Sequence, residues 1–132
     1  MTTVWLDTNV ILRYLRGQPK EQFERSKRLL ARAASGELRV HVSAIVVAEV
    51  TALLVHTYDI SRSEAAQAMI ELVSARGMRT DPDVVAALER TRDRKVDFVD
   101  AYTWLRCTEA EDELASFDND YVRRLGGKIF TF

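Results

Sequence analysis

The chain begins with a short apolar run that ends directly in an acid: Val4-Trp5-Leu6-Asp7-Thr8-Asn9-Val10-Ile11-Leu12. An apolar run without polar alternation is typical of a strand buried on both faces, as in a parallel sheet covered by helices. Asp7 would then lie at the carboxyl end of this strand, the edge at which open α/β sheets bind ligands. Asp7, Thr8 and Asn9 also suit a turn and an N-cap, and this stretch alone favours that simpler interpretation.

Composition narrows the class of protein. A chain of 132 residues favours one domain over 1–132, and 19 basic against 20 acidic side chains give a net charge of -1. This balance argues against a protein held on nucleic acid by its overall charge, but it leaves room for a local basic rim. The single cysteine, Cys107, excludes an internal disulfide and fits a reducing cytoplasm. We expect a cytoplasmic globular protein with neither a membrane span nor a signal segment.

Hydrophobic spacing and capping residues predict an alternating series of strands and helices. The predicted strands are 4–6, 38–42, 77–80, 114–117 and 128–132. The predicted helices cover 10–15, 19 to the stop at Gly36, 44 to about 58, 61 to about 74, a stretch opened by Asp81-Pro82 that ends near Lys95, a stretch opened by Asp97, and a short turn-helix ending at Leu125. This order predicts an α/β fold with a parallel sheet.

Two of the predicted helices carry acids among apolar residues. The helix that Ser43 would cap is apolar nearly all round and is therefore expected to be buried, with Glu49 at its middle. A buried carboxylate normally pairs, binds a metal or becomes protonated, and an ion pair with an arginine would explain Glu49 equally well. Asp97 and Asp100, three residues apart, begin another largely apolar helix, although Asp97 could be only its N-cap.

A second apolar run, Leu114 to Phe117, also ends in an acid, Asp118. Because the carboxyl ends of parallel strands lie at one edge of a sheet, Asp7 and Asp118 are expected to be neighbours. One hypothesis accounts for the four acids Asp7, Glu49, Asp100 and Asp118: they converge and hold a divalent cation. Hard oxygen ligands without histidine or cysteine suit Mg²⁺ or Mn²⁺, which can activate water and stabilise a phosphoryl transition state.

Four segments together resemble the acidic motifs of PIN-domain ribonucleases. They are Leu6-Asp7-Thr8-Asn9-Val10, Ala48-Glu49-Val50-Thr51-Ala52-Leu53-Leu54, Asp97-Phe98-Val99-Asp100-Ala101 and Ser116-Phe117-Asp118-Asn119-Asp120-Tyr121. Each motif alone is weak, but the ordered set is strong and covers essentially the whole chain. Its order and length resemble the VapC-type toxins of prokaryotic toxin–antitoxin pairs.

The resemblance implies a three-layer α/β/α sandwich around a mostly parallel sheet of four to five strands. It also implies Mg²⁺- or Mn²⁺-dependent endonucleolytic cleavage of RNA, inhibition by a VapB-like antitoxin, and a homodimer. The metal carboxylates carried over by residue are Asp7, Glu49, Asp100 and Asp118. The auxiliary positions are Thr8 and Asn9 in the first loop, Ser116 where the family often has Thr, and Asp97 and Asp120, either of which could orient or deprotonate the attacking water.

The sequence leaves two other functions open. One is a Mg²⁺-dependent α/β phosphatase or phosphotransfer domain, although Asp7-Thr8-Asn9 lacks the second Asp of an Asp-x-Asp pattern. The other is a scaffold that only binds RNA or a protein, which would have no need of four poorly solvated acids. If the protein cleaves RNA, its affinity must come from local basic residues. Position alone suggests Arg13, Arg16, Arg94 and Lys95.

Overall fold

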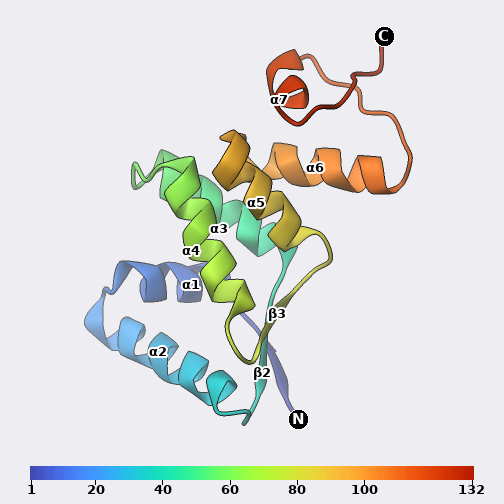
Figure 1. The fold of residues 1–132 in the computed structure, drawn as a ribbon. Coiled ribbons are helices and arrows are strands. Elements are labelled where there is room, and N and C mark those ends of the chain that lie inside the picture. Colours follow the sequence, from blue (N-terminus) through green and yellow to red (C-terminus); the bar gives the residue numbers. More distant parts are fainter.

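A computed structural model describes all 132 residues, 1–132. Its centre is a parallel three-stranded sheet in the order β1 (Thr3–Trp5), β2 (Arg39–Val42) and β3 (Met78–Thr80). Val40 pairs with Val4 on one side and with Met78 on the other. The predicted α/β class and parallel sheet are therefore confirmed (Figure 1).

Seven helices surround or extend this sheet. They are α1 (Thr8–Arg16), α2 (Lys20–Ala34), α3 (Ala44–His56), α4 (Arg62–Ser74), α5 (Val84–Arg94), α6 (Phe98–Glu109) and α7 (Asn119–Arg124). Helix α2 contacts β2 and α4 contacts β3, while α4, α5 and α6 pack in succession. None of the helices is long and apolar enough to cross a membrane.

Side-chain caps set most helix starts where the sequence predicted them. The Ser43 hydroxyl accepts from the Val46 amide at 3.3 Å, and the Ser61 hydroxyl accepts from the Glu64 amide at 3.1 Å. Gly17 ends α1 in the left-handed conformation, which glycine adopts more readily than other residues do. The predicted cap at Asp81-Pro82 is wrong, because α5 begins after Asp83 and the Asp81 carboxylate caps another helix.

Asp81 joins the carboxyl ends of the strands to α3. One carboxylate oxygen accepts from the Ala44 amide at 2.7 Å, and the other lies 3.0 Å from Nε2 of the buried His41. Arg79 donates to Nδ1 of His41 at 3.2 Å, so the Nε2 proton is the one shared with Asp81. The Trp5 ring lies against His41 with a centroid distance of 4.1 Å. His41 is thus a hydrogen-bonded strand residue.

The sheet departs from the prediction in extent and burial. It has three strands and not four to five, because Leu114 and Ile129 form only one isolated bridge with each other. Phe117 is 92% exposed, so the expected buried strand 114–117 is wrong. Burial of the first strand on both faces is wrong as well, since β1 lies at an edge and Trp5 is 62% exposed.

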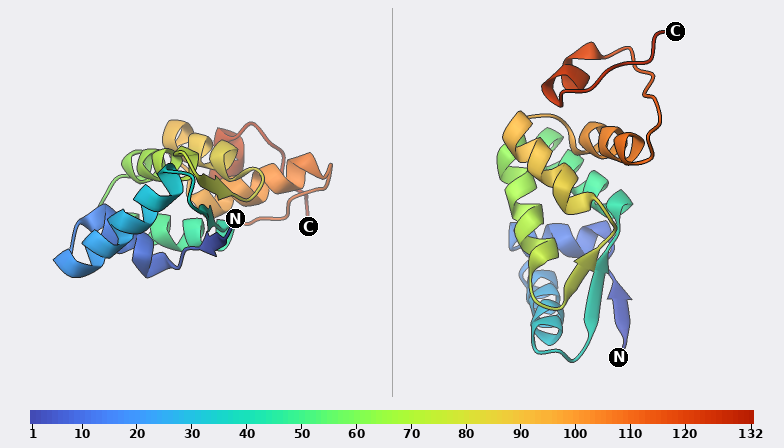
Figure 2. Two further views of the ribbon diagram at one scale, coloured as in Figure 1. Left: turned by 90° about the horizontal axis from the view of Figure 1, so that it is seen from below. Right: turned by 45° about the vertical axis from the view of Figure 1, so that its right-hand side comes forward.

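The C-terminal segment lies at the far end of the molecule from the N-terminus, beyond α6 (Figures 1 and 2). Helix α7 contacts α6, and Val122 is almost completely buried. The Arg124 guanidinium donates to the Lys95 carbonyl at 3.2 Å, which ties α7 to the connection between α5 and α6. This attachment places Asp118 near the start of α6 and not beside β1.

Gly77, just before β3, tests how closely this segment packs against the end of α2. It has φ +82°, and a Cβ built there would overlap the Ala33 carbonyl group at the end of α2. We expect Gly77→Ala to lower the free energy of unfolding by about 2–4 kcal/mol, through left-handed strain and overpacking. Gly36→Ala, at φ +84° with nothing within 4 Å, is the control and should lose only about 1–2 kcal/mol. Equal losses in urea unfolding would show that the contact with Ala33 has no effect.

Candidate acidic site at the helix starts

Most of the acids predicted to form the site lie at helix N-termini. Asp7 is the N-cap of α1, and its Oδ1 accepts from the Asn9 amide at 3.0 Å. Asp118 caps α7 in the same way, accepting from the Asp120 amide at 3.0 Å. Asp100 lies in the first turn of α6. Such positions favour a carboxylate because the unpaired amides and helix dipole are positive there, so the simpler capping interpretation holds for Asp7 without excluding a second role.

Asp97 stands at the N-cap position of α6, but its side chain makes no capping bond. Its Oδ1 instead accepts from Nε of Arg62 at 2.6 Å. The pair borders a hollow of about 150 Å³ between α3, α4, α5 and α6, which Asp100 also lines. The alternative to metal binding is that Glu49 pairs with an arginine. An arginine does pair with an acid of the predicted site, but that acid is Asp97 and not Glu49.

Asp100 is the acid whose surroundings disfavour its charge. Partial burial raises the pKa of the Asp100 carboxyl, and the nearby negative charges of Asp97 and Asp118 raise it further. The Arg62 guanidinium opposes this shift of the Asp100 pKa more weakly. Segments far apart in the sequence therefore bring three acids, Asp97, Asp100 and Asp118, within electrostatic reach of one another.

Glu49 does not have the environment that the sequence predicted. It is exposed on α3, on the same face as Ile45, which is 80% exposed, and Ala52. The prediction that this helix is buried all round is wrong, because Ile45, Glu49 and Ala52 are exposed, whereas Val47, Val50 and Leu54 on the opposite face are buried in the core.

The predicted set of four carboxylates is not assembled in this structure. Asp100 and Asp118 are close enough to interact electrostatically, whereas Asp7 lies at the start of α1 and Glu49 in the middle of α3. No three acidic, histidine or cysteine side chains lie close enough together to hold a metal ion. The expected proximity of Asp7 and Asp118 fails because 114–117 does not join the sheet beside β1.

A family model decides the relationship of the chain to known proteins. The model described as PIN domain matches residues 4–128, nearly the whole chain. This chain belongs to the PIN-domain family. Comparison with curated proteins and comparison with solved structures each found no match.

Membership fits the observed architecture, an α/β fold with a parallel sheet that is consistent with the three-layer sandwich of PIN domains. PIN domains are generally nucleases, so a nuclease-type hydrolase is the supported class of enzyme. They also typically use divalent metals, and the donor chemistry of this PIN domain suits them, because every candidate ligand is a carboxylate. The present arrangement does not bring a full ligand set together.

The auxiliary positions have defined local roles in this PIN domain. Thr8 is buried, while Asn9 is exposed. The Ser116 hydroxyl accepts from the Asp118 amide at 3.0 Å, which shapes the turn that presents Asp118. Asp120 pairs with Arg124 at 3.0 Å.

The residues suggested for RNA binding are scattered. Arg13 of α1 donates to Gln22 of α2. Arg16 stacks on Tyr58, with 4.1 Å between its Cζ and the ring centroid. Arg94 and Lys95 are exposed at the end of α5. The sequence alone suggests no role for Arg62, which stands inside the capping box that opens α4. No local signal links it to Asp97, which lies 35 positions away.

The raised pKa of Asp100 predicts how stability depends on pH. A raised carboxyl pKa means that the native state binds the proton more tightly than the unfolded chain, so stability falls as pH rises through the native pKa. We expect metal-free Asp100→Asn to be more stable than wild type at pH 7, by about 0.5 kcal/mol, since solvent screens a half-exposed group.

The gain from Asp100→Asn should disappear near pH 4, where the unfolded carboxyl, with a pKa of about 3.9, also becomes protonated. Urea unfolding in EDTA at the two pH values measures both differences. A variant that is less stable at pH 7, or a difference that does not change with pH, would contradict the repulsion among Asp97, Asp100 and Asp118.

Proposed function

We propose that this PIN domain is a Mg²⁺- or Mn²⁺-dependent endoribonuclease and the toxin of a type II toxin–antitoxin pair. The observation that carries the proposal is the crowding of negative charge at the start of α6, where Asp97 and Asp118 both raise the pKa of Asp100. A cation relieves such repulsion, and carboxylate oxygens are the ligands that Mg²⁺ and Mn²⁺ prefer. The order of the acids along the chain and the match to the PIN family support the same reaction.

In this proposal Asp7, Glu49, Asp100 and Asp118 would hold the cation once they are brought together. A bound cation would lower the pKa of water and offset the charge that develops on a phosphodiester. Asp97 does not ligate in this scheme: Arg62 holds its Oδ1, and its second oxygen is left to orient the attacking water or accept its proton. Because Arg62 and Asp97 come from α4 and the start of α6, their pairing restrains the Asp97 carboxylate, whose charge acts on Asp100.

The toxin role, the antitoxin, the homodimer and the cytoplasmic location are parts of the same proposal, and they rest on the resemblance to VapC-type toxins. An inhibitor fits the site on physical grounds. The acids form a local anionic surface, so an inhibitory partner is expected to cover it with an arginine or lysine. A single domain over 1–132 likewise remains our proposal.

Chelation tests the metal requirement. We expect purified protein to cleave RNA internally with Mg²⁺ or Mn²⁺, to stop in EDTA, and to recover when the metal is returned in excess. Gel analysis of a labelled RNA measures each step. Cleavage in EDTA at the same positions would refute the metal mechanism. Hydrolysis of a phosphomonoester without cleavage of RNA would favour the phosphatase alternative.

Charge removal tests the assignment of the acids. Asp7→Asn and Asp100→Asn keep the shape of the side chain, and each should lower the cleavage rate by roughly 100-fold or more, the scale on which loss of one charge-stabilising group is felt. Asp112→Asn, at an exposed acid without an ion pair, is the control and should cleave like wild type. Asp100→Asn should lose activity although it gains apo stability. Wild-type rates in Asp7→Asn would reduce Asp7 to a helix cap.

A further inference from the structure

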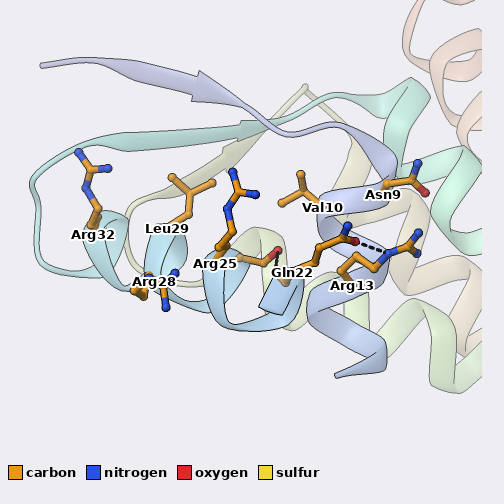
Figure 3. A pocket seen from close by; sticks show the side chains of 9 residues that line it. Asn9, Val10, Arg13, Gln22, Arg25, Arg28, Leu29 and Arg32 are labelled. Atoms are coloured by element: carbon orange, nitrogen blue, oxygen red, sulfur yellow. Dashed lines mark hydrogen bonds between the residues drawn. The ribbon is translucent and has the colours of Figure 1, made fainter. Parts of the chain in front are cut away.

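A groove with a strongly basic lining runs between α1 and α2 (Figure 3). Its volume is about 570 Å³, and only two of its nine lining residues, Val10 and Leu29, are hydrophobic. Four arginines line it, together with Asn9 and Gln22 and no acid: Arg13, Arg25, Arg28 and Arg32. Pockets for small organic ligands are mostly apolar, so this lining indicates a polyanionic ligand instead.

Much of this positive charge is not neutralised by the protein. Arg28 forms no ion pair, and Arg13 is held by a neutral group, since its Nε donates to Oε1 of Gln22 at 2.8 Å. Arg25 lies 3.8 Å from Glu21 in an exposed pair, which contributes little. Arg32 alone has a close carboxylate, Glu37 at 2.9 Å. In a chain of net charge -1, this is a local concentration of cations.

The arginines are arranged as a track. Arg25, Arg28 and Arg32 recur at helical spacing along α2, and with a rise of 1.5 Å per residue they cover about 10 Å of its length. Arg13 and Asn9 continue the lining onto α1. The Asn9 amide is bonded to Asp7, so one end of the groove lies beside a proposed catalytic acid. A row of guanidiniums suits a chain of phosphates, because each can bind a phosphate in bidentate fashion.

We propose that this arginine groove binds the phosphate backbone of a single-stranded segment of the RNA substrate and leads it toward Asp7. The proposal rests on the proposed function for the identity of the polyanion. Arg25, Arg28 and Arg32 lie in one row along a single helix, so they can follow the successive phosphates of one strand. The contacts are to phosphate, so they provide affinity and position but no choice of base.

Equilibrium binding in EDTA tests the groove separately from catalysis. The probe is a short, unstructured, fluorescently labelled RNA, and its anisotropy is followed over a range of salt concentrations. We expect Arg28→Gln to weaken binding severalfold and to reduce the salt slope by about 0.7, the value for one contact to a single strand. The double variant Arg25→Gln/Arg28→Gln should reduce the slope by about 1.4.

Arg76→Gln is the matched control. Arg76 is exposed and makes no ion pair, and it lines a different hollow, shared with Leu30 and Ala34 of α2, and not the arginine groove. This variant should bind like wild type. Wild-type affinity and salt slope in the double variant would overturn the proposal even if the protein cleaves RNA. Conversely, loss of binding in the double variant of a protein that cleaves nothing would support the groove and refute the nuclease.

A competing anion distinguishes RNA from an acidic protein segment. Oligoglutamate of the same charge is titrated against the wild-type complex with RNA. We expect it to compete weakly, since its carboxylates lie on long side chains that lose rotamer freedom on binding, whereas the phosphodiester groups are part of the RNA backbone itself. If oligoglutamate binds more tightly than the RNA and loses as much affinity through Arg28→Gln, the groove is a docking site for an acidic protein and the proposal is wrong.

Discussion

The contact on which the rest of the fold depends is the bond of Asp81 to His41 and to the Ala44 amide. It joins the carboxyl ends of β2 and β3 to the start of α3, while the Trp5 ring brings β1 to the same place. A buried histidine and a buried helix start each need a partner, and one carboxylate satisfies both. This junction fixes where α3 leaves the sheet and therefore where Glu49 stands relative to the other helices.

The proposed chemistry depends on a different feature, the placing of like charges at helix starts. Helix N-termini favour each acid on its own, and Arg62 stabilises Asp97, but partial burial and then the charges of Asp97 and Asp118 raise the pKa of Asp100. The native protein thus keeps an unfavourable arrangement at neutral pH that a cation would relieve. The surface thus carries one anionic region, at Asp97, Asp100 and Asp118, and one cationic region, the arginine groove.

Local signals in the sequence predicted the helices well, and nonlocal contacts explain most of the errors. Ser43, Ser61 and Gly17 act through neighbours a few positions away, so their caps could be read directly. Whether 114–117 joins β1 depends on how the chain packs after α6, which an apolar run cannot reveal. The many apolar residues of α3 also led to the wrong prediction that Glu49 is buried, because its neighbours Ile45 and Ala52 lie on the surface. The raised pKa of Asp100 comes first from its partial burial and then from the charges of Asp97 and Asp118, and no local pattern reveals the burial or the approach of Asp118.

Whether the acids at the helix starts hold a metal ion can be measured by following Mn²⁺ binding with electron paramagnetic resonance. Bound Mn²⁺ loses the sharp signal of the free ion, so a titration reports occupancy without requiring RNA, an antitoxin or turnover. We expect wild type to bind Mn²⁺ and Asp100→Asn and Asp118→Asn each to weaken binding by about tenfold or more, while Asp112→Asn binds like wild type. Folded wild-type protein that leaves all the Mn²⁺ free, or equal binding by all four proteins, would contradict a metal site at these acids.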